Sequence, residues 1–371
     1  MLKDFLLISG IYPPEIGGPA IFAERFSQWT LSNGASVKVV TYSDNSLLEI
    51  TSQGLTLQRV ARKKVIIWRY LIFVKQISRS INKESQVLSV GAFIETYLSS
   101  LILRFSYVAK VPGDIVWERA RNSGKTNLTI EEFQNTKLVF KYKLFRFLYS
   151  QSLRRAKFVV VPSEGLYRLC LLWGVKNEKL SLVYNSVSIP KDSKFILETK
   201  KYHVVTVCRL TPWKGVDELI EYVSKKNLSL VIAGDGPERI HLESLATKLN
   251  ADVLFLGDIP HDSVSALFHE SRVFVLNSHY EGLPHALIEA RAHNILTVAR
   301  AGTGSQEVIH DDVDGLLVRQ DRNLENTLDL IFSGDIDADA FIRRAYEDTE
   351  NRFKQETNFE LLNRILEKTV K

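Results

Sequence analysis

Short apolar runs recur along the whole chain and alternate with longer segments that have the periodicity of helices. In the first half the runs begin at residues 5, 36, 85 and 157, and in the second half at residues 203, 228, 252, 272 and 296. Each run is continuously apolar, as strands of a parallel sheet are when helices cover both faces. The alternation predicts an α/β protein with two doubly wound, Rossmann-like domains.

A polar stretch at residues 186–201 separates the two series of runs. We therefore expect a first domain over residues 1–188 and a second over residues 189–371, which suits a chain of 371 residues. The charged segment 339–371 predicts one or two amphipathic helices. We expect the last of them, at about residues 350–371, to pack on the first domain.

The longest apolar stretch, residues 87–108, does not have the character of a membrane span. It contains Glu95 and Arg104 and is interrupted at Gly91. It predicts a strand followed by a helix. The opening residues show no secretory signal, which leads us to expect a cytoplasmic protein.

Composition excludes several classes of protein. Hydrophobic residues make up 45% and charged residues 25% of the chain, as in soluble globular proteins. Disordered, collagen-like and disulfide-stapled proteins are therefore excluded. The two cysteines, Cys170 and Cys208, fit a reducing compartment and offer no metal-binding cluster.

Charge is distributed unevenly between the two halves. Residues 1–190 carry 26 basic and 13 acidic side chains, a net charge of +13, whereas residues 191–371 carry 22 and 30, a net charge of −8. A basic half joined to an acidic half suggests that the first half meets an anionic partner. Nucleic acid and an acidic membrane surface are the two candidates.

Two glycine and cation motifs follow predicted strands. Gly17 and Gly18 lie between the first strand and a helix, where free backbone amides suit a phosphate, although a tight turn is equally consistent with the pattern. Arg209 and Lys214 follow the strand that opens the second domain, and Gly215 leads into a helix. Two cations at that end of a sheet are suited to hold a diphosphate.

Two further motifs lie in the second half. Gly236 belongs to a Gly-Asp-Gly-Pro turn after a strand, where a ligand could approach the backbone closely. Glu281 and Glu289 are eight residues apart, the first in a loop and the second in the following helix. Carboxylates of this kind bind sugar hydroxyls, as in Rossmann sites; an acid/base or nucleophile pair is the alternative.

Taken together, these motifs resemble one known family. The segments YPPEIGGPA, VYNSV, RLTPWKG, AGDGP, FLGDIP and EGLPHALIEA resemble retaining glycosyltransferase family 4, which has the GT-B fold. The resemblance spans nearly the whole chain. It implies two Rossmann-like domains that face a central cleft, with C-terminal helices that cross back to the first domain.

The resemblance also implies roles for individual residues. Arg209 and Lys214 would hold the donor's diphosphate, Glu289 the ribose hydroxyls and Glu281 the transferred sugar. The remaining donor contacts that it implies are Gly17, Gly18, Gly236, Ile259, Gly282, Leu283 and Pro284. It implies a nucleotide-sugar donor, retention of configuration, and neither a cofactor nor a metal ion.

The chain departs from the family pattern at one place. Many members have a first-domain histidine against the sugar, but this chain has no histidine before His203. Asp114 stands at the corresponding place, so we expect it to join Arg209, Lys214 and Glu281 as a catalytic residue; a turn residue is the alternative. Asp335, Asp337 and Asp339 match the D-x-D metal signature, but helix capping explains them better.

A basic and aromatic segment in the first half predicts a membrane contact. Residues 59–83 combine eight cations with three aromatic residues, and read as a helix they would offer an apolar and a cationic face. Residues 137–155 form a second such run. The expected contact residues are Arg62, Lys63, Lys64, Trp68 and Arg69. A helix packed on the sheet with a solvated basic face is the alternative.

These observations predict a hexosyltransferase-type enzyme that moves a sugar from a nucleotide-sugar donor to a carbohydrate or lipid-linked acceptor. Cell-envelope polysaccharide, lipopolysaccharide or glycolipid synthesis is the expected setting, at the inner face of the cell membrane. The absence of a recognisable nucleic-acid module argues against a nucleic-acid partner. A nucleotide-sugar epimerase and a non-catalytic scaffold of an envelope assembly complex remain alternatives.

Overall fold

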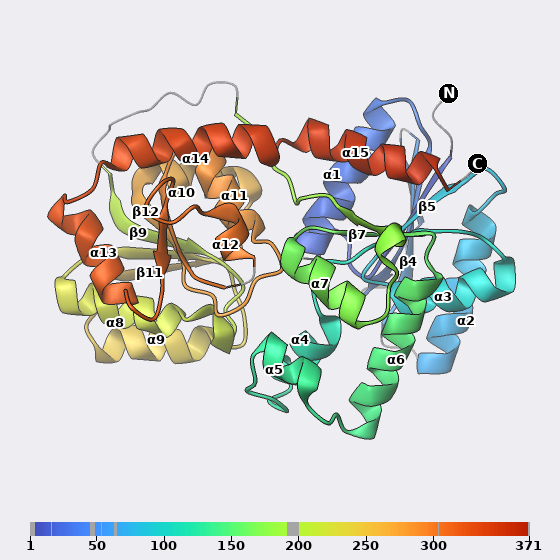
Figure 1. Ribbon diagram of the computed structural model, residues 1–371, viewed down its shortest axis with the longest axis horizontal. Coiled ribbons are helices and arrows are strands. Elements are labelled where there is room, and N and C mark those ends of the chain that lie inside the picture. Colours follow the sequence, from blue (N-terminus) through green and yellow to red (C-terminus); the bar gives the residue numbers. More distant parts are fainter. Residues whose placement is uncertain are drawn as a thin grey trace. The chain divides into compact units, whose positions relative to one another are not determined.

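The computed structural model describes residues 4–15, 17–44, 49–52, 54–62, 65–190, 200–302 and 304–369. The chain divides into two compact units (Figure 1). Unit 1 consists of Met1–Tyr184 together with Thr357–Lys371, and unit 2 is Asn185–Glu356.

Unit 1 is built on a single sheet. Its strands are β1 (Phe5–Ser9), β2 (Val37–Ser43), β3 (Glu49–Ser52), β4 (Leu55–Ala61), β5 (Gln86–Val90), β6 (Val108–Lys110), β7 (Phe158–Val161) and β8 (Leu180–Leu182). Its helices are α1 (Gly18–Ser32), α2 (Ile66–Ser80), α3 (Phe93–Leu103), α4 (Ile115–Asn122), α5 (Ile130–Asn135), α6 (Phe140–Arg155), α7 (Glu164–Leu172) and η1 (Asn177–Lys179), and α15 (Gln355–Glu367) returns to this unit.

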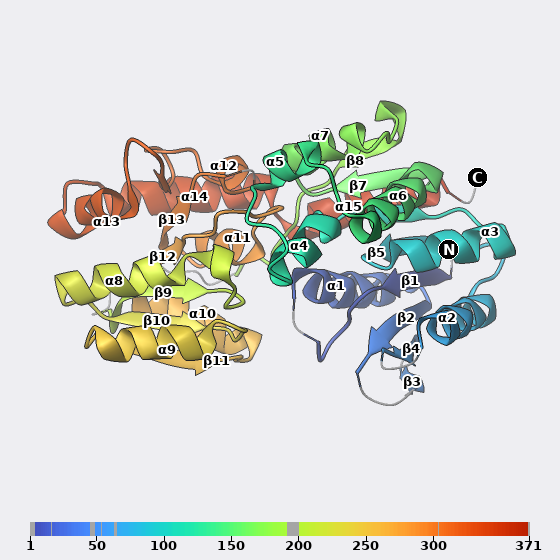
Figure 2. The same ribbon diagram turned by 90° about the horizontal axis from the view of Figure 1, so that it is seen from below.

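The described strands of unit 1 lie in the order β3-β4-β2-β1-β5-β6-β7-β8. All neighbours pair in parallel except β3, which forms an antiparallel edge with β4 (Figure 2). Helices α1 and α15 cover one face, where Phe26 and Phe359 meet edge to face at 5.1 Å between ring centroids. Helix α3 packs between α2 and α6. The expected return of the last helix to the first domain is confirmed.

Unit 2 has the second sheet. Its strands are β9 (Tyr202–Val207), β10 (Leu230–Ala233), β11 (Val253–Gly257), β12 (Ser271–Leu276), β13 (Leu296–Arg300) and β14 (Leu316–Val318). Its helices are η2 (Pro212–Lys214), α8 (Val216–Lys226), α9 (Arg239–Lys248), α10 (His261–Glu270), α11 (His285–Ala292), α12 (Ser305–Val308), α13 (Leu324–Ser333) and α14 (Ala338–Arg352).

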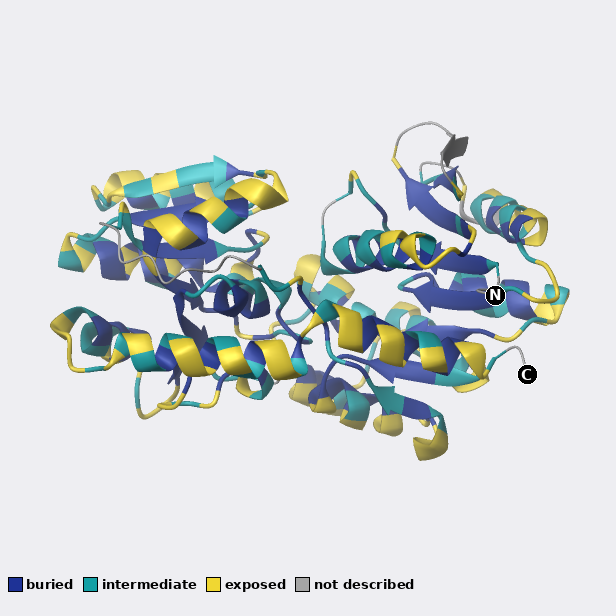
Figure 3. Cartoon of the chain, turned by 90° about the horizontal axis from the view of Figure 1, so that it is seen from above, coloured by how far each residue is buried: buried dark blue, intermediate teal, exposed yellow. Residues whose placement is uncertain are grey.

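The described strands of unit 2 lie in the order β11-β10-β9-β12-β13-β14 and pair in parallel. Helices α8 and α9 lie along one face of this sheet, and α10, α11 and α14 along the other (Figure 1). Apart from the edge strand β11, the strands are mostly buried, and the helices expose their outer sides (Figure 3). The predicted pair of doubly wound parallel sheets is therefore confirmed.

The sequence-based reading of residues 59–83 as one helix is wrong at its start. Arg59 and Val60 belong to β4, and the helix begins at Ile66. The alternating apolar residues of a short edge-side strand are hard to distinguish from the first turn of a basic helix. In the part of the chain that the structure describes, no helix is both long enough and apolar enough to cross a bilayer.

Candidate active site

The order of strands in unit 2 reverses at β9. From β9 the chain moves outward through β10 to β11, and then returns to place β12 on the other side of β9. Ligands in open α/β sheets bind at such a switch point, beyond the carboxyl ends of the strands. The loops that follow β9 and β12 carry Arg209, Lys214 and Glu281, so these three residues gather at the switch point.

Lys214 and Glu281 form an ion pair in these two loops. The Lys214 Nζ lies 2.5 Å from Glu281 Oε1, and the two side chains are only 15% and 16% exposed. Arg209, in contrast, is exposed and makes no ion pair or hydrogen bond with the residues that the structure describes. The site thus combines a cation open to a ligand with a second cation whose charge is balanced by a carboxylate.

A buried amide connects the two loops. The side chain of Asn277, only 1% exposed, donates from Nδ2 to the Gly215 carbonyl at 2.8 Å. Gly215 has a φ of 58°, and a Cβ there would lie 2.6 Å from Asn277 Nδ2, so both the backbone conformation and the close contact favour glycine. This contact holds the end of the β9–α8 loop, and therefore Lys214, against the loop that carries Glu281.

A chain of charged residues holds the Asn277 side chain in place. Arg300 donates to Asn277 Oδ1 at 3.1 Å and to Glu218 at 2.5 Å. His279 lies 3.7 Å from Glu218. The His279 ring and the Arg300 guanidinium lower the pKa of Glu218 below its usual value, against the effect of burial. Glu218 is therefore ionised at neutral pH and fixes the orientation of Arg300.

The turn that contains Gly236 packs directly on the β9 loop. The Glu238 amide donates to the Leu210 carbonyl at 3.1 Å. A Cβ at Gly236 would lie 2.2 Å from Leu210 O, too close for any other residue. The turn at Gly236 therefore packs against the backbone of Leu210 and helps to fix the loop that carries Arg209.

Glu289 lies on α11 and faces the start of α10. The His261 Nε2 of that helix donates a short hydrogen bond to Glu289 Oε1. Glu289 is 16% exposed, and Ile259, half-buried, lies two residues before His261. The expected base and ribose contacts, Ile259 and Glu289, are therefore brought to one region of unit 2.

The segment between Glu281 and α11 is held by an asparagine. Asn185 Nδ2 donates to the Leu283 carbonyl at 3.0 Å, and both residues are buried. Gly282 and Pro284 flank Leu283 immediately before the helix begins at His285. Backbone amides at the start of a helix are suited to an anionic ligand. The Asn185 contact therefore fixes the segment that leads into the amino-terminal end of α11.

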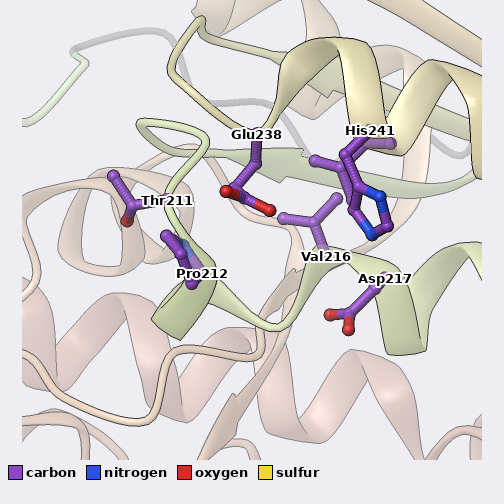
Figure 4. Close-up of a pocket in the computed structure, with 7 residues that line it drawn as sticks. Thr211, Pro212, Val216, Asp217, Glu238 and His241 are labelled. Atoms are coloured by element: carbon purple, nitrogen blue, oxygen red, sulfur yellow. The ribbon is translucent and has the colours of Figure 1, made fainter. Parts of the chain in front are cut away.

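A small cavity lies beside the β9–α8 loop, but its chemistry does not suit a nucleotide. It measures about 90 Å³ and lies between the starts of α8 and α9 (Figure 4). Asp217 and Glu238 both line it. Its volume is enough for about three water molecules, and its two carboxylates would repel a diphosphate. The loops that carry Arg209 and Glu281 are the better candidate.

In unit 1, Gly17 and Gly18 lie where a phosphate-binding turn is expected. Gly17 has a φ of 151° and precedes α1, which begins at Gly18. Arg62 braces this β1–α1 loop: its Nη2 donates to the Gly10 carbonyl at 2.9 Å and to Glu15 at 3.0 Å. Arg62, one of the residues expected to contact the membrane, therefore supports the β1–α1 loop.

Asp114 caps a helix inside unit 1. Its carboxylate is fully buried and accepts hydrogen bonds from the Val116 and Trp117 amides at 2.9 and 3.1 Å and from Gln134 at 2.9 Å. Burial raises the pKa of Asp114, and these hydrogen bonds oppose the increase. Both carboxylate oxygens are engaged in structure, so the contacts support the turn-residue alternative rather than a group at the sugar.

The D-x-D segment also serves as a cap. Asp337 accepts from the Ala340 amide at 3.0 Å at the start of α14, and Asp335 accepts from the Ser333 hydroxyl at 2.6 Å. The capping interpretation of Asp337 is confirmed. Elsewhere, His310, Asp314 and Asp348 lie close enough to hold a metal.

The Arg291 guanidinium already occupies the centre of that second cluster. Arg291 is 0% exposed and lies 3.0 Å from Asp314 and 2.9 Å from Asp348. Arg352 also pairs with Asp348, at 2.5 Å, so two guanidinium charges balance the two carboxylates. These ion pairs give the cluster a structural role, with Arg291 and Asp314 buried at its centre.

Sequence reasoning missed the residues that hold the site together. Asn277 and Arg300 each stand at the end of a predicted strand, and Asn185 stands in the VYNSV segment. The signal that could have identified Asn277 and Arg300 is a polar residue at the carboxyl end of an apolar run. Their partners could not be deduced, because each contact joins segments more than 20 residues apart.

Comparison with known proteins gives the class of protein, a glycosyltransferase of the kind that uses nucleotide-sugar donors. Residues 188–348 match the family described as "Glycosyl transferases group 1". This match and the similarity to curated glycosyltransferases bear out the resemblance of the motifs to glycosyltransferase family 4 and the expectation of an enzyme.

Two curated relatives illustrate the range of similarity. An uncharacterized glycosyltransferase of Methanocaldococcus jannaschii is 22% identical over 345 residues, which cover 84% of each chain. A Campylobacter jejuni α-1,4-N-acetyl-D-galactosaminyltransferase, named for an acceptor on undecaprenol diphosphate, is 33% identical over 205 residues. That match covers 52% of this chain and 55% of the Campylobacter protein.

Solved structures show the same fold. Sucrose-phosphate synthase of Thermosynechococcus elongatus superposes with a TM-score of 0.79 at 18% identity, covering 99% of this chain and 98% of that one. Anabaena HepE, solved with UDP, superposes with a TM-score of 0.73 at 17% identity, covering 98% and 100%. The GT-B fold expected from the motifs is confirmed.

Proposed function

We propose that this glycosyltransferase moves a sugar from a nucleoside diphosphate donor to a carbohydrate or lipid-linked acceptor, with retention of configuration, in the synthesis of a cell-envelope polysaccharide or glycolipid. The observation that carries the proposal is the grouping of Arg209, Lys214 and Glu281 at the switch point of unit 2. The Campylobacter relative, whose name gives a lipid diphosphate acceptor, supports the acceptor class.

The ion pair between Lys214 and Glu281 suits the departure of a diphosphate. Negative charge builds on the leaving group as its bond to the anomeric carbon breaks. Arg209 and Lys214 would balance that charge, the form of catalysis that usually contributes most to a rate. A donor diphosphate that attracts Lys214 would leave Glu281 free to accept hydrogen bonds from the sugar hydroxyls.

Proton transfer completes the proposed reaction. The acceptor hydroxyl oxygen bonds to the anomeric carbon, the bond from that carbon to the diphosphate oxygen breaks, and the hydroxyl proton passes to the departing phosphate. This scheme needs no enzymic nucleophile and no metal ion. Because Asp114 is occupied as a cap, we assign it no part in these steps.

A panel of nucleotide sugars tests the donor assignment. A matching donor at about 100 times its dissociation constant adds about 2.7 kcal/mol of stability, which should raise the melting temperature by about 5–10 °C. Free nucleoside diphosphate should then appear when acceptor is added, and its release should continue in EDTA. Interconversion of sugar nucleotides without release would instead indicate an epimerase, and dependence on manganese would overturn the metal-free scheme.

We also propose that unit 1 docks on an anionic membrane. Lys63 and Lys64, two expected contacts, lie outside the described residues, and Arg69 lies over the Tyr42 ring at 5.2 Å. Trp68 of α2 is 64% exposed and Phe140 of α6 is 79% exposed. Because α3 packs between these two helices, both aromatic residues belong to one layer of unit 1. Exposed aromatic residues beside cations are typical of helices that lie at a membrane surface.

The double variant Trp68→Ser/Phe140→Ser is expected to bind vesicles that contain phosphatidylglycerol about tenfold more weakly, because it removes two apolar side chains worth about 1 kcal/mol or more on insertion. Co-sedimentation measures this. Ile240→Ser on α9, where the side chain is 82% exposed, is the control and should bind as the native protein does. Equal binding by all three proteins would leave these helices as ordinary solvated surfaces. Arg62 is left intact because it braces the β1–α1 loop.

A further inference from the structure

A basic cavity of about 380 Å³ opens in unit 1. Its lining includes Tyr97 of α3, Gln151, Arg154 and Arg155 of α6, and Lys176 and Lys179 of the segment before β8. Helix α6 leads into β7, and the 176–179 segment leads into β8. The cavity therefore lies toward the amino-terminal end of the sheet, whereas Gly17 follows the carboxyl end of β1.

The charge of this cavity is unbalanced. Of the described side chains that line it, four are cationic and none is acidic. Glu178 lies beside it and pairs with Lys176 at 3.5 Å, but both side chains are 73% exposed, so solvent weakens this pair. Arg154 and Arg155 form no ion pair with the residues that the structure describes.

The pKa of Lys179 reflects the repulsion among these cations. Its Nζ donates to the carbonyls of Arg154 and Ala156 at 2.8 and 2.9 Å, which fixes the ammonium at the end of α6. Burial lowers the pKa of Lys179, and the charges of Lys176 and Arg155 lower it further. A bound anion would relieve this repulsion.

We propose that this cavity binds a phosphate-bearing anion at a site separate from the donor's diphosphate site. Arginine side chains form paired hydrogen bonds with phosphate oxygens, and the Tyr97 hydroxyl and Gln151 amide supply neutral donors. A volume of about 380 Å³ lies within the range of small-ligand sites. The proposal does not rest on the assignment of Arg209 and Lys214, which belong to unit 2.

Two sources could supply the phosphate: a soluble phosphorylated compound or a phospholipid headgroup. Apolar side chains near the cavity are the reason to test the second source. Ile102, 65% exposed, lies at the end of α3 about one turn beyond Tyr97, and Leu172, 72% exposed, lies at the end of α7 four residues before Lys176. Both sources share the same chemistry, a phosphate held by arginine and lysine.

The test removes the cavity's charge without touching Lys179, which stabilises the end of α6. The pocket variant is Arg154→Gln/Arg155→Gln/Lys176→Gln. The control variant, Lys83→Gln/Lys125→Gln/Lys248→Gln, removes the same charge from exposed lysines that do not line the cavity. Lys176→Gln alone is a milder variant that alters one exposed side chain.

Calorimetric titration with inorganic pyrophosphate is the first measurement, made in an Arg209→Ala/Lys214→Ala background so that the donor site does not contribute. We expect the pocket variant to bind at least tenfold more weakly than the background and Lys176→Gln to be intermediate, because charged hydrogen bonds to phosphate are lost. The control variant should bind unchanged. Equal weakening in the pocket and control variants would show a diffuse charge effect and overturn the site.

Co-sedimentation with phosphatidylglycerol vesicles and with pure phosphatidylcholine vesicles is the second measurement, and it separates the sources. A loss of phosphatidylglycerol binding confined to the pocket variant identifies a headgroup site. A loss of pyrophosphate binding with unchanged vesicle binding identifies a soluble phosphate site. Unchanged binding in both measurements, with a folded pocket variant, overturns the proposal.

Discussion

Replacing Lys214 with alanine is expected to lower the turnover of sugar transfer by about 100-fold or more, and Arg209→Ala is expected to have a similar effect. Both substitutions remove a cation that balances charge on the departing diphosphate. Because that charge develops as the bond breaks, the loss should appear in kcat as well as in kcat/KM. Steady-state kinetics at saturating donor concentration is the measurement.

Lys225→Ala is the matched control for Lys214→Ala. Lys225 lies on α8, 64% exposed, and its Nζ lies 2.6 Å from Glu325, an ion pair far from the switch point in the fold. Its removal should change turnover less than about twofold, since exposed ion pairs contribute little. A folded Lys214→Ala enzyme with turnover close to native would refute the leaving-group role. A change in KM alone would indicate that Lys214 only binds the donor.

The second large effect concerns stability. Arg291→Met is expected to destabilise unit 2 by about 3–5 kcal/mol, because it leaves the Asp314 carboxylate, only 3% exposed, without its buried partner. Denaturant unfolding followed by hydrogen exchange in β12, β13 and β14 would measure the loss within unit 2. Arg364→Met, at an exposed pair on α15 with 3.6 Å between the charges, is the control and should cost less than about 1 kcal/mol.

The Arg291 network also predicts how stability depends on pH. Burial alone would raise the pKa of Asp314, but Arg291 and His310 outweigh it, so the pKa lies below the usual 3.8. A depressed carboxyl pKa contributes stability that is present above the unfolded-state value and is lost as pH falls through the folded-state value. Native unit 2 should therefore lose stability below about pH 4 more steeply than an Asp314→Ala variant. Parallel pH profiles would contradict this reasoning.

The parallel strands were predictable because their signal is local. Within the run beginning at residue 272, residues 273–276 are all apolar, as is typical of a strand covered on both faces. The loops after such strands follow from the topology, which is why Arg209 and Glu281 could be named from the sequence. The strands β3, β4, β6, β8 and β14 were missed. For β6, β8 and β14 the reason is their length, since three residues carry too little pattern.

The residues that were misjudged or missed depend on contacts distant in the sequence. Asp114 has the spacing of a site residue, but whether its oxygens are free depends on Gln134, which lies 20 residues further along the chain. Arg62 has the composition of a basic surface, yet Glu15 and the Gly10 carbonyl bind it. A charged side chain's partner is decided by the packing of segments, and a single sequence does not show that packing.

The return of α15 to unit 1 has a consequence for the order in which the protein is made. Phe359 packs on Phe22, Phe26 and Trp29, so these three aromatic residues of α1 lack their cover until residues 357–371 have been synthesised. Those residues follow all of unit 2. At about 5–20 residues per second, the ribosome needs on the order of ten seconds to make Asn185–Glu356. During that interval the nascent unit 1 exposes an apolar aromatic surface that could associate with other chains. Unit 2, although it is synthesised later, can therefore complete its folding before unit 1 does.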